Sequence, residues 1–276
     1  MNRIFYSIKS WLSFWFKSGT IYNIHSPFVY DFLNHVMDTE KEYYVYQNLE
    51  AIRLRLLKDT RKLNNEDYGA GSKIKTRTHS VKISEIANKS LSGPSKCRIL
   101  FNAVSYLNPE TILEAGTSLG MSSAYMASAR RASVLITLEG NKDIARIARE
   151  THESAGLSNI EILTGKFKDT LEPALKKLNR IDLVYLDGHH SFEPTMQYFN
   201  TVLIYSHSKT VIILDDIYWS EDMESAWKAI KTHPAVSLTI DIYNLGFVFL
   251  DTSLSKEDVR LVPFLLKPWR LGLFGK

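Results

Sequence analysis

Short apolar runs alternate with helix-length amphipathic stretches from Thr111 onward, and this alternation narrows the folds open to the chain. Such a pattern is typical of parallel strands joined by crossover helices, because each strand is buried on both faces and each helix on one. The sequence therefore predicts an α/β fold with a doubly wound, mostly parallel sheet. Its parallel strands are predicted over residues 111–115, 134–139, 160–163, 181–187 and 211–216.

The last two predicted strands, 237–243 and 246–251, have only Asn244 and Leu245 between them. A two-residue connection is too short for a crossover, so these strands must form an antiparallel hairpin. With the five parallel strands, the hairpin completes a predicted sheet of seven strands.

No convincing strand pattern precedes this region, and the first hundred residues look helical and irregular. We therefore predict a helical N-terminal cap over residues 1–107 and a catalytic domain over residues 108–276. The segment Asp67–Ser72 resembles a glycine-rich cofactor loop, but no apolar strand comes before it. It is interpreted as a surface or lid loop.

Charge and cysteine content exclude several classes of site. Lysine and arginine total 34 against 30 aspartates and glutamates, and the net charge of +4 gives no support for a nucleic-acid partner. Cys97 is the only cysteine, which rules out an intrachain disulfide and a cysteine-rich zinc site. A reducing compartment fits this composition, so a cytoplasmic location is predicted.

The N-terminal twenty residues place aromatic and aliphatic side chains at helical spacing, with basic residues between them. Two interpretations fit this pattern. The helix either docks on its own domain or on a twin subunit in a homodimer, or makes weak contact with a membrane surface. The apolar members are Phe5, Ile8, Trp11, Leu12, Trp15 and Phe16, and the basic ones are Arg3, Lys9 and Lys17.

A glycine-containing loop, 114–120, follows the first predicted strand and leads directly into a helix. Gly116 allows a sharp turn, Gly120 allows close approach of the backbone, and the N–H groups that begin the helix suit a carboxylate. Glu139 ends the second strand, where Rossmann-type sites carry an acid for ribose hydroxyls. This order of strand, loop, helix and acid predicts a nucleoside cofactor that carries an amino-acid group.

The motif LEAGTSLGMSS resembles the first motif of class I S-adenosylmethionine-dependent methyltransferases, especially O-methyltransferases of the catechol-methylating kind. The resemblance spans about half of the chain and implies a Rossmann-like fold, S-adenosylmethionine as cofactor and a small-molecule hydroxyl as acceptor. It places Glu139 at the ribose, Asn141 near the adenine, and the 164–167 loop beside the adenine. The residues it implies around the rest of the cofactor are Glu114, Gly116, Thr117, Ser118, Gly120 and Asp187.

Three acids follow the fourth and fifth strands, which are neighbours in the strand order of this family. Asp187 ends the fourth, and Asp215 and Asp216 end the fifth. Converging carboxylates repel one another, and a hard divalent cation such as Mg²⁺ would remove that cost. In related enzymes such a metal holds the acceptor and activates its hydroxyl. His190 resembles the base of some metal-dependent sugar O-methyltransferases, and His189 is the weaker candidate.

Other interpretations stay open. Asp187 and Asp215 would equally serve as helix caps, and Tyr218 and Trp219 as substrate walls or as packing residues. The run 23–28 either touches substrate or begins a helix. An NAD-type oxidoreductase would use the same loop and acid, but the third glycine is missing and the acids stay unexplained. A non-catalytic, membrane-associated binding module is the alternative from another class, and the sequence does not name the acceptor.

Overall fold

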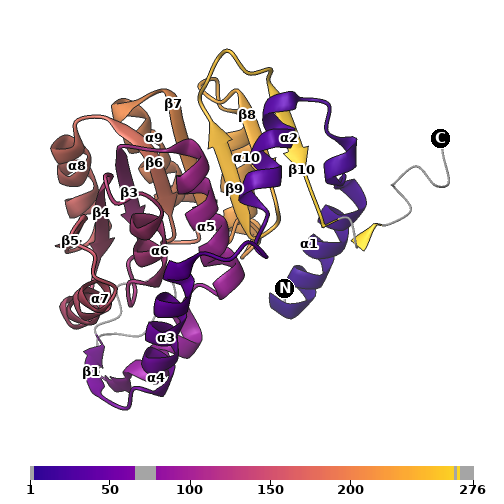
Figure 1. Cartoon of the computed structure of the whole chain (residues 1–276). Helices are drawn as coiled ribbons and strands as arrows, with labels where there is room; N and C mark the ends of the chain where they lie inside the picture. The colour runs from indigo at the N-terminus through magenta and orange to yellow at the C-terminus, as the bar shows by residue number, and fades with distance from the viewer. Residues whose placement is uncertain (1–2, 66–78, 264–265, 268–276) are drawn as a thin grey trace. The chain divides into compact units, whose positions relative to one another are not determined.

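The computed structural model describes residues 3–65, 79–263 and 266–267. The chain divides into two compact units, and the elements of both are labelled in Figure 1. The first unit combines Met1–Asn34 with Val184–Lys276, and the second is His35–Leu183.

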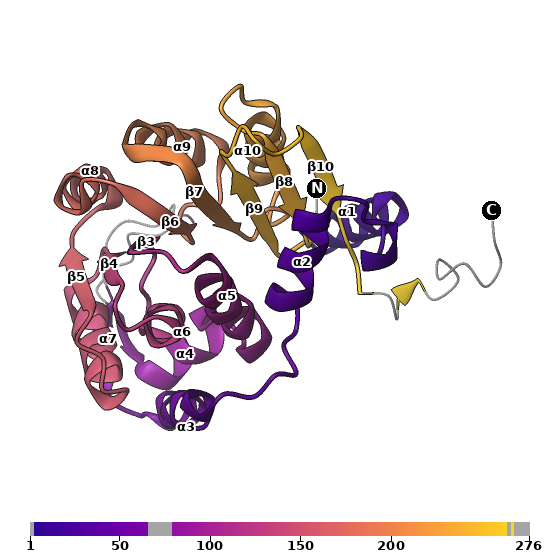
Figure 2. The same cartoon turned by 45° about the horizontal axis from the view of Figure 1, so that its top comes forward.

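The second unit contains the strands that were predicted first along the chain. Strands β3 and β4 pair in parallel, as do β4 and β5, and the first half of β6 lies beside β3. Helices α5, α6 and α7 cover one face of these strands and α8 covers the other (Figure 2). The bounds are β3 Thr111–Ala115, β4 Val134–Glu139, β5 Ile160–Thr164, β6 Ile181–Leu186, α5 Pro94–Leu107, α6 Met121–Ala129, α7 Lys142–Ser154 and α8 Phe167–Leu178.

The prediction that no strand precedes residue 107 is wrong. A short antiparallel pair places Leu63 of β1 opposite Val81 of β2. Apart from these two residues the strands are polar, so they lack the alternation that would have predicted them. The segment Asp67–Ser72, predicted to be a surface or lid loop, lies outside the described residues. The bounds are α3 Tyr44–Lys58, β1 Lys62–Asn65, β2 His79–Lys82 and α4 Ile83–Ser90.

The first unit contains the predicted antiparallel hairpin, formed by β8 and β9, with β9 also antiparallel to β7. Its strand order is β10-β8-β9-β7-β6, where β6 contributes its second half. Strand β10 pairs in parallel with β8, so the mixed sheet has eight strands among the described residues and not the predicted seven. The bounds are β7 Ser206–Asp215, β8 Leu238–Asp241, β9 Leu245–Phe249 and β10 Glu257–Arg260.

Helices pack on both faces of β9. Phe28 and Phe32 of α2 contact Phe249 edge-on, with ring centroids 5.5 and 5.2 Å apart. On the other face, a Cβ at Gly246 would lie 2.8 Å from the Trp227 ring of α10, so glycine is required there. The run 23–28 thus leads into α2, which agrees with the interpretation that it begins a helix. The remaining helices of this unit are α1 Arg3–Lys17, the short 3₁₀ turn Ile21–Asn23, α2 Pro27–Val36, α9 Phe192–Tyr205 and α10 Glu221–Thr232.

Helix α1 docks on its own unit through one narrow face. Tyr6, Ser10 and Phe14 recur every four residues and are buried. The Tyr6 hydroxyl donates to the backbone oxygen of Ser220 (3.0 Å) and to Glu224 (2.8 Å). None of the described helices combines the length and hydrophobicity that crossing a bilayer requires.

The compact units do not divide at residue 107. The segment before Asn34 belongs with the C-terminal strands, whereas α3, α4 and α5 belong with β3, β4 and β5. The idea that residues 1–107 act as a cap stays a prediction.

Candidate functional site

The loop after β3 turns through left-handed backbone conformations. Gly116, Ser118 and Gly120 have φ values of 114°, 48° and 85°. The N–H groups of Gly116 and Thr117 both donate to the Leu138 carbonyl of β4 at 3.1 Å. The loop is thus tied to the neighbouring strand at the point where it leads into α6.

Glu139, at the end of β4, is joined directly to this loop. Its carboxylate accepts one hydrogen bond from the Ser118 N–H and another from the Asn141 N–H, both at 2.9 Å. Burial raises the pKa of the Glu139 carboxyl, although these backbone hydrogen bonds oppose the shift. The structure thus brings together the loop and the acid that the sequence predicted to share one cofactor.

Glu114 and Thr117 hold the loop from the core of the unit. The Glu114 carboxyl is fully buried and accepts hydrogen bonds from the Ser122 and Thr137 hydroxyls. Burial raises its pKa to about 7, against the effect of these hydrogen bonds. The Thr117 and Thr137 hydroxyl oxygens lie 2.6 Å apart. Contacts of Glu114 and Thr117 with a cofactor stay predictions, while their contribution to loop geometry is visible here.

Gly120 permits a close approach of two helices. A Cβ at this position would lie 2.7 Å from His152 Nε2 and 3.2 Å from Ala148 of α7. His152 also lies 2.8 Å from the Ser123 hydroxyl, and burial lowers its pKa to about 4. His152 was not predicted, because a lone histidine in an amphipathic helix gives no signal that its ring meets a loop 32 positions earlier.

Asn141 caps helix α7. Its side-chain oxygen accepts from the N–H groups of Asp143 (2.8 Å) and Ile144 (3.2 Å), which the first turn of a helix leaves unpaired. Gly165, in the loop predicted to pass the adenine, donates its N–H to the Glu139 carbonyl at 2.9 Å. Both residues therefore border Glu139, and their contact with adenine stays a prediction.

The three predicted acids belong to the first unit, where β6 and β7 are neighbours. Asp187 accepts from the Tyr185 hydroxyl at 3.3 Å, and its other oxygen lies 3.8 Å from His190 Nε2. Asp215 is 2% exposed. Asp216 has a φ of 49° and donates its N–H to the Asn244 carbonyl of the β8–β9 turn at 2.8 Å.

Carboxylate oxygens are ligands that Mg²⁺ prefers, so the residue types at these strand ends suit the predicted cation. Within residues 3–65, 79–263 and 266–267, no group of three histidine, cysteine, aspartate or glutamate side chains is placed to hold a metal ion. The predicted cation site at Asp187, Asp215 and Asp216 stays a prediction.

The two histidines after β6 differ in their surroundings. His189 has a φ of 53°, its Nδ1 lies 3.3 Å from the Tyr198 hydroxyl, and burial lowers its pKa, helped by the nearby charge of His190. The His190 ring lies 5.5 Å from that of Trp219. His190 is thus the histidine with both an aspartate and an exposed aromatic ring beside it.

Tyr218 and Trp219 also differ in their surroundings. The Tyr218 hydroxyl donates to the buried Asp241 carboxylate at 2.7 Å, and its ring stacks on Tyr243 at 5.0 Å. Trp219 is 40% exposed and lies next to His190. Tyr218 is therefore held by packing, and Trp219 is the better candidate for a substrate wall.

Known proteins support the predicted resemblance to class I S-adenosylmethionine-dependent O-methyltransferases. A family model described as a methyltransferase domain matches residues 113–217. Catechol O-methyltransferase B of Danio rerio is 39% identical over 100 residues, which are 34% of this chain and 38% of that protein. Catechol O-methyltransferase of Sus scrofa is 34% identical over 100 residues, which are 34% of this chain and 53% of that protein. The match spans less than two thirds of either relative.

Solved structures confirm the Rossmann-like fold of a methyltransferase. The O-methyltransferase of Bacillus cereus in complex with S-adenosylhomocysteine gives a TM-score of 0.53 at 19% identity, over 80% of this chain and 96% of that one. A Podospora anserina methyltransferase, also bound to S-adenosylhomocysteine, gives 0.57 at 14% identity, over 82% and 97%.

Proposed function

We propose that this protein transfers the methyl group of S-adenosylmethionine to a hydroxyl of a small molecule, helped by a divalent cation. The main support for the proposal is the hydrogen bond between the Glu139 carboxylate and the Ser118 N–H in the loop Gly116–Gly120. The order of strand, loop, helix and acid around this bond is that of class I methyltransferases. In the proposed complex the methionine carboxylate lies at the N-terminus of α6, where N–H groups lack helical partners, and the ribose lies at Glu139.

Methyl transfer from a sulfonium is an in-line displacement: the acceptor oxygen bonds to the methyl carbon as the carbon–sulfur bond breaks. S-Adenosylhomocysteine leaves, and the hydroxyl proton must go to a base. His190 is the proposed base, and Asp187, 3.8 Å from its Nε2, would stabilise the imidazolium that forms. A bound cation would lower the pKa of the acceptor hydroxyl. Its proposed ligands are Asp187, Asp215 and Asp216.

We expect the protein to bind S-adenosylhomocysteine with micromolar affinity, and the Glu139→Ala variant to bind it about 1 to 3 kcal/mol more weakly, the usual cost of an unsatisfied buried polar partner. Isothermal titration calorimetry measures both. Glu153→Ala is the matched control, because Glu153 is an exposed glutamate of α7 in the same unit. A wild-type protein that binds NAD but neither S-adenosylmethionine nor S-adenosylhomocysteine would refute the proposed function.

We also propose that α1 lies on an anionic membrane surface. Cytoplasmic location and homodimer formation stay predictions. Opposite its docked face, α1 exposes a stripe of Phe5, Ile8, Leu12 and Phe16. The helix has no acidic residue, and Lys9 and Lys17 are exposed. Such a helix suits the boundary between acyl chains and anionic headgroups.

Phe5→Ser combined with Phe16→Ser should reduce sedimentation of the protein with vesicles of phosphatidylglycerol and phosphatidylcholine several-fold, because both aromatic rings of the stripe are removed. The docked face keeps Tyr6 and Phe14, so the fold is expected to persist. Ile204→Ser on α9 removes an apolar side chain that is even more exposed, and it should have no effect. If wild-type protein stays in the supernatant and elutes as a dimer that the double variant abolishes, a second copy occupies the stripe.

A further inference from the structure

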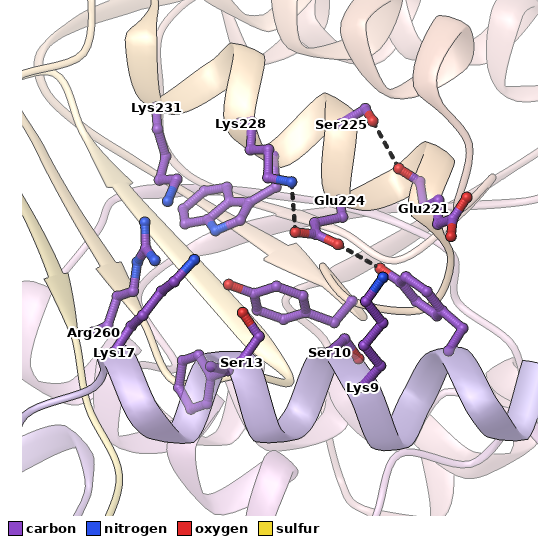
Figure 3. Close-up of a pocket in the computed structure, with 14 residues that line it drawn as sticks. Lys9, Ser10, Ser13, Lys17, Glu221, Glu224, Ser225, Lys228, Lys231 and Arg260 are labelled. Atoms are coloured by element: carbon purple, nitrogen blue, oxygen red, sulfur yellow. Dashed lines mark hydrogen bonds and ion pairs between the residues drawn. The ribbon is translucent and has the colours of Figure 1, made fainter.

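The first unit contains a pocket of about 430 Å³ that neither the cofactor loop nor the acids at the strand ends use. Helix α1 forms one side, α10 another, and the end of β10 closes a corner (Figure 3). Aromatic side chains, Phe14, Tyr218 and Trp227 among them, form part of the lining. The pocket is therefore built from three segments that are far apart in the sequence.

Positive charge dominates the lining. Five cations, from Lys9, Lys17, Lys228, Lys231 and Arg260, face two carboxylates, Glu221 and Glu224. Lys228 pairs with Glu224 at 2.6 Å, and Glu224 also accepts the Tyr6 hydroxyl. Among the described residues, neither Lys9 nor Lys17 lies within ion-pair distance of a carboxylate.

Three of these cations point toward one corner of the pocket. Figure 3 shows the head groups of Lys17, Lys231 and Arg260 directed toward one another. Two carboxylates among the described residues act on this corner. Asp258 lies 3.0 Å from Lys231 Nζ and 2.8 Å from Arg260 Nη2. The charge of the buried Asp241 carboxylate also acts on Lys231 and Arg260. Burial alone would lower the pKa of Arg260, and the Asp258 contact raises it. Three cations against two carboxylates leave the corner with a net positive charge.

Convergence of like charges is unfavourable unless an anion offsets it. The Lys231 side chain is only 9% exposed, so water would screen a charge-assisted hydrogen bond to its ammonium group only weakly. A guanidinium beside two ammonium groups presents donors from several directions, which suits the tetrahedral oxygens of a phosphate better than one planar carboxylate.

We propose that this pocket binds a phosphate monoester, with the phosphoryl group held by Lys17, Lys231 and Arg260. The organic part of the ligand lies against Phe14 and Tyr218. The site belongs wholly to the first unit, so the proposal does not depend on methyl transfer or on the cation at the strand ends.

Isothermal titration calorimetry of the full-length protein with phenyl phosphate tests the site. Wild-type protein should bind phenyl phosphate more tightly than inorganic phosphate, because the ring gains the aromatic wall, and should bind neutral benzyl alcohol far more weakly than either. Lys17→Gln should weaken phenyl phosphate binding about tenfold or more, as expected for a lost charged hydrogen bond. Lys17→Arg should restore most of the affinity.

Lys168→Gln is the matched control, because Lys168 is an exposed lysine of α8 in the other unit. It removes the same charge and should leave binding unchanged. The proposal is overturned if wild-type protein does not bind phenyl phosphate, if benzyl alcohol binds equally well, or if Lys17→Gln and Lys168→Gln behave alike.

Discussion

Replacing Glu114 by glutamine is expected to flatten the pH dependence of stability of the cofactor-free protein. Burial raises the pKa of this carboxyl to about 7 in the folded state, from its ordinary value of 4.5. Between these values the folded state keeps a proton that the unfolded chain has lost. The contribution of this carboxyl to the free energy of unfolding should therefore be greatest below pH 4.5 and should fall by about 3 kcal/mol as pH rises to 7, at about 1.4 kcal/mol per pKa unit.

Urea denaturation at pH 4.5, 6 and 8 measures this contribution as the difference between wild type and Glu114→Gln. The amide is close to the carboxyl in size and does not titrate. The free energy of unfolding of Glu114→Gln relative to that of wild type should therefore rise by about 3 kcal/mol from pH 4.5 to 8. Glu153→Gln, on an exposed helix face, should follow the wild-type profile. Parallel profiles for wild type and Glu114→Gln would show that the carboxyl is ionised in the folded state throughout.

The central strands could be predicted because their hydrophobic runs end at polar or glycine residues. The limits of β3 and β4 agree with the sequence prediction residue for residue. Strand β7 begins at Ser206 and not at the predicted Val211, since its first residues are polar and pair without an apolar pattern. Strand β10 was missed for the same reason, because Val259 is its single buried residue.

The link between Glu139 and the loop that contains Ser118 followed from spacing, since the ends of adjacent parallel strands lie at one edge of a sheet. The contact of Gly120 with His152 could not be predicted this way. It joins a loop to the far part of a helix, and only the packing of α6 against α7 brings the two together.

The three acids after β6 and β7 illustrate what strand order alone does not predict. Their strands are neighbours, as predicted, but Asp216 lies just past the end of β7, where the alternation of a strand no longer applies. Asp215 is buried at the end of β7, whereas Asp216 follows in a left-handed turn tied to Asn244. Strand order predicted that β6 and β7 are neighbours, whereas the directions of these side chains depend on turn geometry that the sequence pattern does not encode.

Asp187→Ala is expected to lower methyl transfer by a factor of about 10² to 10⁴, the range for loss of acid–base assistance. The substitution removes the carboxylate beside His190 and one proposed ligand of the cation. The measurement is transfer of a labelled methyl group to a panel of catechols and sugar hydroxyls at saturating S-adenosylmethionine. Asp169→Ala, at an exposed position of α8, is the control and should retain full activity.

Two further experiments distinguish the proposed roles of Asp187 as a cation ligand and as a partner of His190. If a cation is required, excess chelator should abolish wild-type turnover and Mg²⁺ or Mn²⁺ should restore it, while Asp216→Asn keeps much of the activity because its amide oxygen can still coordinate. If Asp187 acts only through His190, wild type should turn over fully in chelator, and His190→Asn should reproduce the loss and remove the acidic limb of the pH–rate profile. Undiminished activity of Asp187→Ala would exclude both roles and leave the carboxylate as a structural residue of the loop after β6.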